Sequence, residues 1–114
     1  MTVQRSERFD TDVERQFRWY LLETDLGPVA ALALATRFAE AVDAALEVLR
    51  RNPEIGPRRF QTYPDLAGTR SWRVRKPFHR FMIFYRIEGT VLSAERLLEG
   101  HFRMAGGPGV SPRC

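Results

Sequence analysis

The chain has 114 residues and a mass of 13.2 kDa, enough for one domain with its own hydrophobic core. No apolar run approaches the roughly 20 residues of a membrane span, and the first residues lack the apolar block of a signal peptide, so we expect a cytoplasmic protein without a membrane segment. The single cysteine, Cys114, excludes an internal disulfide and a cysteine metal cluster, and we expect neither a cofactor nor a metal.

The net charge of +4 is divided unevenly along the chain. Residues 1–50 hold six basic and nine acidic side chains, a net charge of −3, whereas residues 51–114 hold twelve basic and five acidic ones, a net charge of +7. A field of this kind favours an anionic partner, either nucleic acid or an acidic protein segment, and charge alone does not choose between them.

The first predicted elements are a short edge strand at Thr2 to Arg5 and an amphipathic helix after it. Thr11 and Glu14 have the capping-box spacing and predict the start of this helix, with Ser6 as the alternative start. Apolar side chains at spacings of three and four form the face that we expect to pack on the sheet: Phe9, Val13, Phe17, Tyr20 and Leu21.

A second apolar cluster lies on the opposite side of the same helix. Trp19, Leu22 and Leu26 come together when the helix is drawn at about 100° per residue. No internal partner is evident for them, and exposed apolar clusters often mark interaction surfaces. We therefore predict that these three residues bind a partner.

A longer, alanine-rich helix is predicted over residues 29–51. Gly27 is expected to cap the end of the first helix, and Pro28 suits the first turn of the second. Asn52 ends the second helix because a residue before a proline, here Pro53, is pushed out of the helical region. Helices joined by so short a turn must form an antiparallel hairpin.

Residues 68–103 contain three runs rich in β-branched and aromatic residues, separated at Pro77 to His79 and at Glu88-Gly89. Such runs are typical of a three-stranded antiparallel meander, in which Glu88-Gly89 makes the second turn. We predict an α+β fold: an N-terminal antiparallel helix hairpin packed on a three- to four-stranded antiparallel sheet. Residues 1–104 form the single domain, and residues 105–114, with three Gly and two Pro, form a flexible tail.

The first run of the meander also carries candidate binding residues. Arg73 and Arg75 share one face of this strand, while Trp72 and Val74 share the other. The strand can therefore bury an apolar side and present a basic one. We predict that Arg70, Arg73 and Arg75 contact an acidic partner through guanidinium–carboxylate hydrogen bonds.

The order of these elements resembles the ParE branch of the ParE/RelE toxin superfamily over nearly the whole chain. The resemblance depends on the first helix and on four stretches: NPEIGPR (52–58), GTR (68–70), FMIFYR (81–86) and RLLEG (96–100). In the last strand the family commonly has Leu-His-Gly-x-Arg, whereas Glu99 occupies the position of that histidine here.

The resemblance implies the toxin of a bacterial type II toxin-antitoxin system, of the kind used in plasmid stabilisation. Such a toxin is neutralised by a cognate, acidic antitoxin in a hetero-oligomer. ParE-like members inhibit DNA gyrase, whereas RelE-like members are ribosome-dependent endoribonucleases that cut mRNA. The first implies an inhibitory binding protein and the second an enzyme.

The enzyme alternative needs a group that accepts the proton of the RNA 2′-OH, a proton donor for the leaving oxygen, and cations for the developing charge. The candidates under this alternative are Arg80, Tyr85, Arg86, His101 and Arg103. Tyr85, however, alternates with Phe81, Ile83 and Ile87 in the pattern of a core aromatic. With no clear acid and base pair, we leave the catalytic residues unassigned and predict a gyrase-inhibiting binding protein.

Overall fold

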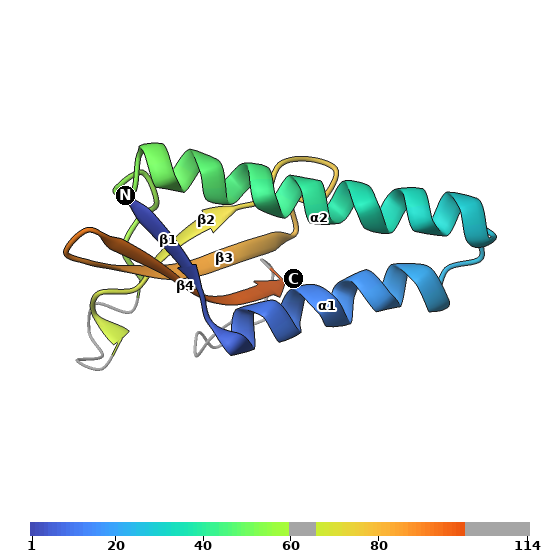
Figure 1. Cartoon of the computed structure of the whole chain (residues 1–114), viewed down its shortest axis with the longest axis horizontal. Coiled ribbons are helices and arrows are strands. Elements are labelled where there is room, and N and C mark those ends of the chain that lie inside the picture. The colour runs from blue at the N-terminus through green and yellow to red at the C-terminus, as the bar shows by residue number, and fades with distance from the viewer. Residues whose placement is uncertain (60–65, 100–114) are drawn as a thin grey trace, which may run out of the picture.

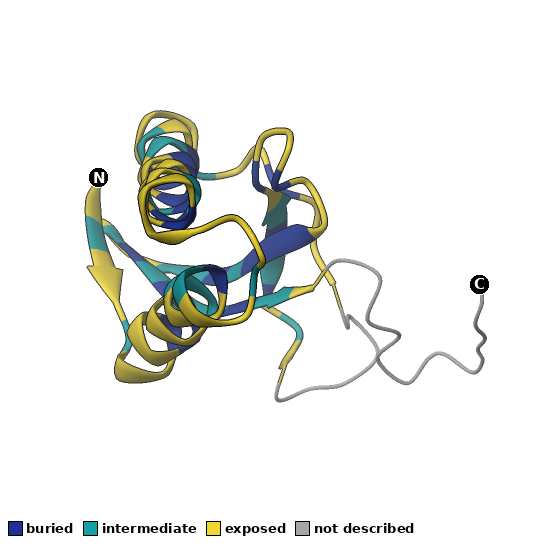
Figure 2. Ribbon diagram, turned by 90° about the vertical axis from the view of Figure 1, so that its right-hand side faces the viewer, coloured by how far each residue is buried: buried dark blue, intermediate teal, exposed yellow. Residues whose placement is uncertain are grey.

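The computed structural model describes residues 1–59 and 66–99 (Figure 1). In chain order its elements are β1 (Thr2–Arg5), α1 (Glu7–Leu22), α2 (Pro28–Arg51), β2 (Arg70–Arg73), β3 (Phe81–Glu88) and β4 (Val91–Glu99). The two helices form an antiparallel hairpin that packs on the sheet, and Figure 2 shows them nearly end-on, one above the other. The predicted α+β fold is confirmed.

The four strands form one sheet in the order β1-β4-β3-β2. The two hairpin pairs, β2 with β3 and β3 with β4, are antiparallel as predicted. The edge strand β1 exists at the predicted residues, but it pairs with β4 in parallel, so the sheet is mixed. The connection is long enough for parallel pairing, because the chain passes through the whole helix hairpin and two strands before it reaches β4.

Helix α1 begins directly after β1, and Ser6 is its N-cap. The Ser6 hydroxyl accepts a hydrogen bond from the backbone N–H of Phe9 at 3.0 Å and donates one to the carbonyl of Glu95 in β4 at 2.9 Å. The preferred start at Thr11 and Glu14 was wrong, since both residues lie inside the helix. The alternative start at Ser6 is the observed one, because this hydroxyl also attaches the start of the helix to the sheet.

The turn between the helices differs from the prediction in the role of Gly27. Helix α1 ends earlier, where the N–H of Glu23 donates to the carbonyl of Trp19 and the Thr24 hydroxyl donates to that of Tyr20. Gly27, with a φ of 84°, instead precedes α2 as its N-cap residue. A positive φ suits glycine because it has no Cβ to clash with the backbone.

The core lies between the helix hairpin and the sheet. Its fully buried members come from both helices and from β3 and β4, and include Phe9, Phe38, Val42, Leu49, Ile83, Tyr85 and Leu92. An aromatic cluster joins the layers, with ring centroids of Phe38 at 5.4 Å from Tyr20, 5.5 Å from Phe78 and 5.4 Å from Phe81. Aromatic rings at these separations attract one another, and this attraction adds to the stabilisation that comes from burying their surface.

Asp12 contacts β4 beyond the residues that pair with β1. The buried carboxylate of Asp12, on α1, accepts hydrogen bonds from Arg96 Nε at 2.7 Å, from Arg96 Nη2 at 3.1 Å and from the backbone N–H of Leu97 at 2.9 Å. The side chain of Asp12 therefore satisfies a strand donor that a further strand would otherwise take.

Among the described residues, no helix is long and apolar enough to cross a membrane. The predicted domain boundary at residue 104, the tail at 105–114 and the candidates His101 and Arg103 all lie outside the described residues.

Candidate partner-binding site

The edge strand β2 is bordered by the segment that leads away from α2. The N–H of Arg59 donates to the carbonyl of Thr69 at 2.7 Å, and the N–H of Ser71 donates to the carbonyl of Pro57 at 3.1 Å. An isolated bridge also joins Arg58 to Arg70. Residues 57–59 therefore lie along the first half of the β2 edge.

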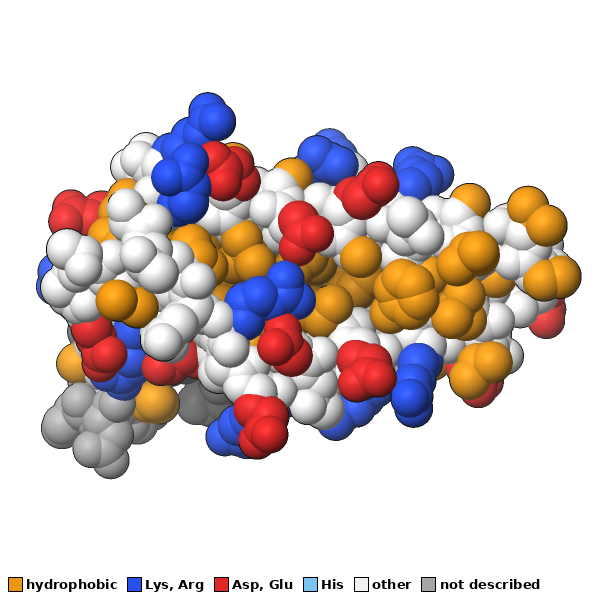
Figure 3. Space-filling model, viewed as in Figure 1, with side chains coloured by type: hydrophobic (Ala, Val, Ile, Leu, Met, Phe, Trp, Pro, Cys, Tyr) orange, Lys and Arg blue, Asp and Glu red, His pale blue; other side chains and the backbone are white. Residues whose placement is uncertain are grey.

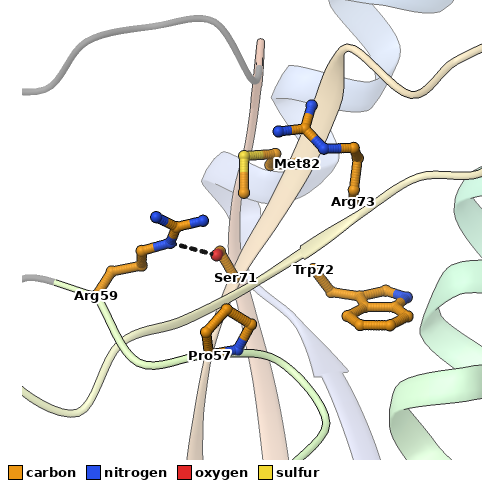
Figure 4. Close-up of a pocket in the computed structure, with 6 residues that line it drawn as sticks. All are labelled: Pro57, Arg59, Ser71, Trp72, Arg73 and Met82. Carbon is orange, nitrogen blue, oxygen red and sulfur yellow. Dashed lines mark hydrogen bonds between the residues drawn. The ribbon is translucent and has the colours of Figure 1, made fainter.

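Beside this contact is a cavity of about 220 Å³ that contains two arginines (Figure 4). Its lining residues are Pro57, Arg59, Ser71, Trp72, Arg73 and Met82. Arg59 Nε donates to the hydroxyl of Ser71 at 2.7 Å, and Arg73 Nη1 donates to the carbonyl of His79 at 2.6 Å. Ser71 and Met82 are buried, so the cavity combines an apolar wall with two held guanidinium groups.

The basic residues predicted for the first meander strand take two different positions, and Arg75 lies beyond the end of β2 at Arg73. Arg73 and Arg75 are exposed, whereas Val74 between them is buried and Trp72 packs against the core, as the alternation predicted. Arg70 instead turns back, and its Nη1 donates to the carbonyl of Glu54 at 3.1 Å and to that of Gly56 at 2.8 Å. Arg70 thus helps to hold the segment after α2.

Among the described residues, the cations around β2 lack the carboxylate neighbours that most other cations have. On the helices and on β3 and β4, most arginines lie within 4.0 Å of an acidic oxygen, as with Arg50 beside Glu47 and Arg96 beside Asp12. Within the described part of the chain, no carboxylate lies that close to any basic side chain between residues 58 and 76. These side chains are Arg58, Arg59, Arg70, Arg73, Arg75 and Lys76. We call this set the basic edge.

Tyr85, a candidate for RNA chemistry, is a structural residue. Its ring is fully buried, and its hydroxyl donates to the carbonyl of Pro53 at 2.7 Å and accepts from the N–H of Gly56 at 3.0 Å. Burial raises the pKa of its phenol above the ordinary value, against the opposing effects of the Gly56 hydrogen bond and the charge of Arg70. A buried hydroxyl that is already bonded twice is poorly placed to accept a substrate proton.

The two other described candidates lie on different parts of the sheet. Arg80 Nε lies 4.0 Å from a carboxylate oxygen of Glu99, and its guanidinium carbon lies 5.1 Å from the ring centroid of Phe81. Arg86 Nε lies 3.5 Å from a carboxylate oxygen of Glu95. Both cations therefore already have acidic neighbours.

The predicted apolar cluster lies at the turn end of the helix hairpin. Trp19 is 45% exposed, Leu22 74% and Leu26 52%. Two residues that the prediction missed, Val29 and Leu32 at the start of α2, are exposed as well. Figure 3 shows hydrophobic side chains gathered at this end of the molecule. We call these five residues the hairpin tip.

Four cavity residues were not singled out from the sequence as site residues: Pro57, Arg59, Ser71 and Met82. Arg59 is the second residue of an arginine doublet at 58–59, which could have indicated a basic site in the connection. Met82 belongs to an apolar run of the sequence, and nothing in the sequence placed it next to Arg59.

Comparison with known proteins decides the family. A family model described as the ParE toxin of the type II toxin-antitoxin system, parDE, matches residues 3–101. The chain belongs to the ParE toxin family. The predicted resemblance to ParE is thereby confirmed. No sequence match is found among curated proteins.

A solved structure described as the chromosomal ParDE TA system from P. aeruginosa shares the ParE fold with this chain. The two superpose with a TM-score of 0.63 at 17% sequence identity, over 87% of this chain and 95% of that one.

Proposed function

We propose that this ParE family member acts in the cytoplasm as a toxin that inhibits DNA gyrase by binding it, and that a cognate acidic antitoxin neutralises it. Membership of a family of type II toxins supports the toxin role. The observation that favours binding over catalysis is the Tyr85 hydroxyl, which is occupied by Pro53 and Gly56.

The basic edge is our proposed antitoxin surface. Arg73 and Arg75 are exposed, and no carboxylate of the described residues neutralises them. An acidic segment placed there would gain charge-assisted hydrogen bonds, which are roughly twice as strong as neutral ones. It would also neutralise a region of concentrated positive charge.

The hairpin tip is our proposed gyrase surface. It exposes five large apolar side chains at one end of the molecule, away from the sheet (Figure 1). Truncating buried apolar or aromatic anchors at an interface often costs more than about 2 kcal/mol of binding free energy. Trp19 is the candidate anchor because of its size.

The alternative is ribosome-dependent mRNA cleavage, because the basic edge would also attract RNA. That reaction needs a proton acceptor as well as cations. The described candidates Arg80 and Arg86 supply no proton acceptor, since a guanidinium stays protonated at neutral pH.

Gyrase supercoiling of relaxed plasmid tests the proposal. The purified chain should reduce supercoiling in proportion to its concentration, and addition of its antitoxin should restore the activity. Full supercoiling at a large molar excess of the chain would contradict the proposal.

A further inference from the structure

Three arginines of the basic edge are held by neutral oxygen atoms. Arg59 Nε donates to the hydroxyl of Ser71. Arg73 donates to the carbonyl of His79, and Arg70 donates to two carbonyls of the segment after α2. A neutral acceptor orients a guanidinium without cancelling its charge, and each guanidinium has five N–H donors, so all three keep donors for a ligand. The basic edge therefore presents oriented positive charges that the described residues do not neutralise.

The exposed cations come from two segments that border one another. Arg58 and Arg59 belong to the segment after α2, which is hydrogen-bonded to the start of β2. Arg73 is the last residue of β2, and Arg75 and Lys76 follow it in the chain. All five residues are exposed. They form one basic surface at this edge of the sheet, with the guanidinium groups of Arg59 and Arg73 at the cavity (Figure 4).

This surface lacks an exposed aromatic ring among the described residues. Trp72 packs against the core, and its ring points away from the guanidinium groups of Arg59 and Arg73 (Figure 4). Proteins that bind single-stranded nucleic acid stack its bases on aromatic side chains. A duplex needs no such surface, because its bases already stack on one another and its phosphates face outward. Cations without a stacking surface therefore favour a duplex over a single strand.

We propose that the basic edge binds the phosphate backbone of duplex DNA, independently of base sequence. This inference rests on the proposed gyrase target, because gyrase acts on duplex DNA, and it adds a second contact to that target. The hairpin tip binds gyrase, and the basic edge binds the DNA that gyrase holds. An antitoxin that covers the basic edge also removes this contact with DNA.

The test measures binding of a fluorescein-labelled DNA duplex to the full chain by anisotropy at several salt concentrations. Affinity should fall with salt, because each contacted phosphate releases counterions and adds about 0.9 to the slope of log affinity against log salt. A duplex of the same length and a different sequence should bind within about 3-fold, since phosphate contacts carry no base information. A single-stranded RNA with the same number of phosphates should bind at least about 5-fold more weakly.

Double variants locate the site. Arg73→Gln with Arg75→Gln should weaken duplex binding at least about 10-fold and reduce the salt slope by about 1.8, the share of two phosphate contacts. Arg75→Gln with Lys76→Gln should do the same, and it leaves the bond from Arg73 to His79 in place. Arg8→Gln with Arg37→Gln removes the same charge from exposed positions on α1 and α2 and should weaken binding by less than about 3-fold. Unchanged unfolding transitions show that the variants are folded.

Two results of the binding experiment would overturn the inference. If the helix variant loses as much affinity as the two edge variants, the general positive field explains the binding. If the single-stranded RNA binds more tightly than the duplex through the same arginines, the basic edge is an RNA surface.

Gyrase inhibition separates this inference from the proposed function. If the basic edge contacts DNA in the gyrase complex, Arg73→Gln with Arg75→Gln should require at least about 5-fold more chain for the same inhibition of supercoiling. Equal inhibition by this variant and the wild type would overturn the inference and leave the gyrase target standing. Duplex binding through the basic edge without any inhibition would overturn only the proposed gyrase target.

Discussion

The backbone N–H of Gly56 donates a hydrogen bond to the hydroxyl of Tyr85 at 3.0 Å, from 29 positions earlier in the chain. The same hydroxyl donates to the carbonyl of Pro53, and Arg70 holds the carbonyls of Glu54 and Gly56. The segment after α2 is therefore fastened to the central strand. This attachment sets the path of residues 57–59, of which Pro57 and Arg59 line the cavity beside β2.

Replacing Tyr85 with Phe keeps the ring and removes the hydroxyl. The carbonyl of Pro53 and the N–H of Gly56 then lose a partner, so the free energy of unfolding should fall by about 1–3 kcal/mol. Denaturant unfolding at neutral pH measures the loss. An unchanged midpoint would contradict the structural role assigned to this hydroxyl.

The same variant predicts a pH effect. Because burial raises the folded-state pKa of Tyr85 above the ordinary 10.0, its contribution to stability is complete below pH 10.0 and is lost as the pH rises through the raised value. The difference in unfolding free energy between the wild type and Tyr85→Phe should therefore shrink above pH 10.0. A constant difference across this range would show that the phenol titrates normally.

Gly56 should tolerate no side chain. A Cβ at this position would lie 2.6 Å from the hydroxyl oxygen of Tyr85 and would also press on the backbone carbonyl of Ser71. Overpacking of this kind costs about 1–3 kcal/mol. Thermal unfolding of Gly56→Ala should show this loss, whereas Gly68→Ala, whose Cβ would meet only Arg86 Nη1 at 3.6 Å, serves as the matched control. Equal stability of the two variants would contradict the close approach.

Among the acidic residues of α1, Asp12 should contribute the most to the stability of the fold. Asp12→Ala leaves the N–H of Leu97 and the guanidinium of Arg96 without their acceptor, at a cost of about 1–3 kcal/mol. Because Arg96 is partly exposed, water hydrates its guanidinium in this variant. The loss of unfolding free energy is therefore smaller than for a fully buried ion pair. Asp10→Ala breaks only an exposed pair with Arg5 and should cost less than about 1 kcal/mol. Chemical denaturation of both variants compares them, and the reverse order would contradict the edge role of Asp12.

The hairpin tip should affect gyrase inhibition without affecting stability. Leu22→Glu changes a side chain that is 74% exposed, so the unfolding free energy should stay within about 0.5 kcal/mol of the wild type. Gyrase inhibition should weaken at least about 10-fold, because a charge would enter an apolar interface. Val48→Glu, an exposed apolar position near the other end of α2, is the control and should inhibit normally. Equal inhibition by both variants would show that the hairpin tip does not bind gyrase.

The elements could be predicted because their signals are local. The apolar stripe of α2, the alternation in β3 and the Glu88-Gly89 turn each depend on neighbours within a few residues, and all are present. The start of α1 was misassigned because two capping patterns compete, and Ser6 is preferred through its bond to Glu95 of β4, a contact that no local pattern records. The parallel pairing of β1 was missed for the same reason.

The candidate site was predicted only in part. The exposure of Arg73 and Arg75 follows from strand alternation, and that of Trp19, Leu22 and Leu26 follows from helix periodicity. The cavity depends on contacts between distant segments. Arg59 meets Ser71 twelve positions later, and Gly56 meets Tyr85 only after the chain has turned back through β2 and β3.

The most direct test of the central claim, that this toxin acts by binding rather than by cleaving RNA, uses one preparation of the chain against two targets. The chain is added to gyrase with plasmid DNA and, in parallel, to translating ribosomes with end-labelled mRNA. We predict that gyrase supercoiling is inhibited and that the mRNA stays intact. Cleaved mRNA with unaffected gyrase would contradict this account.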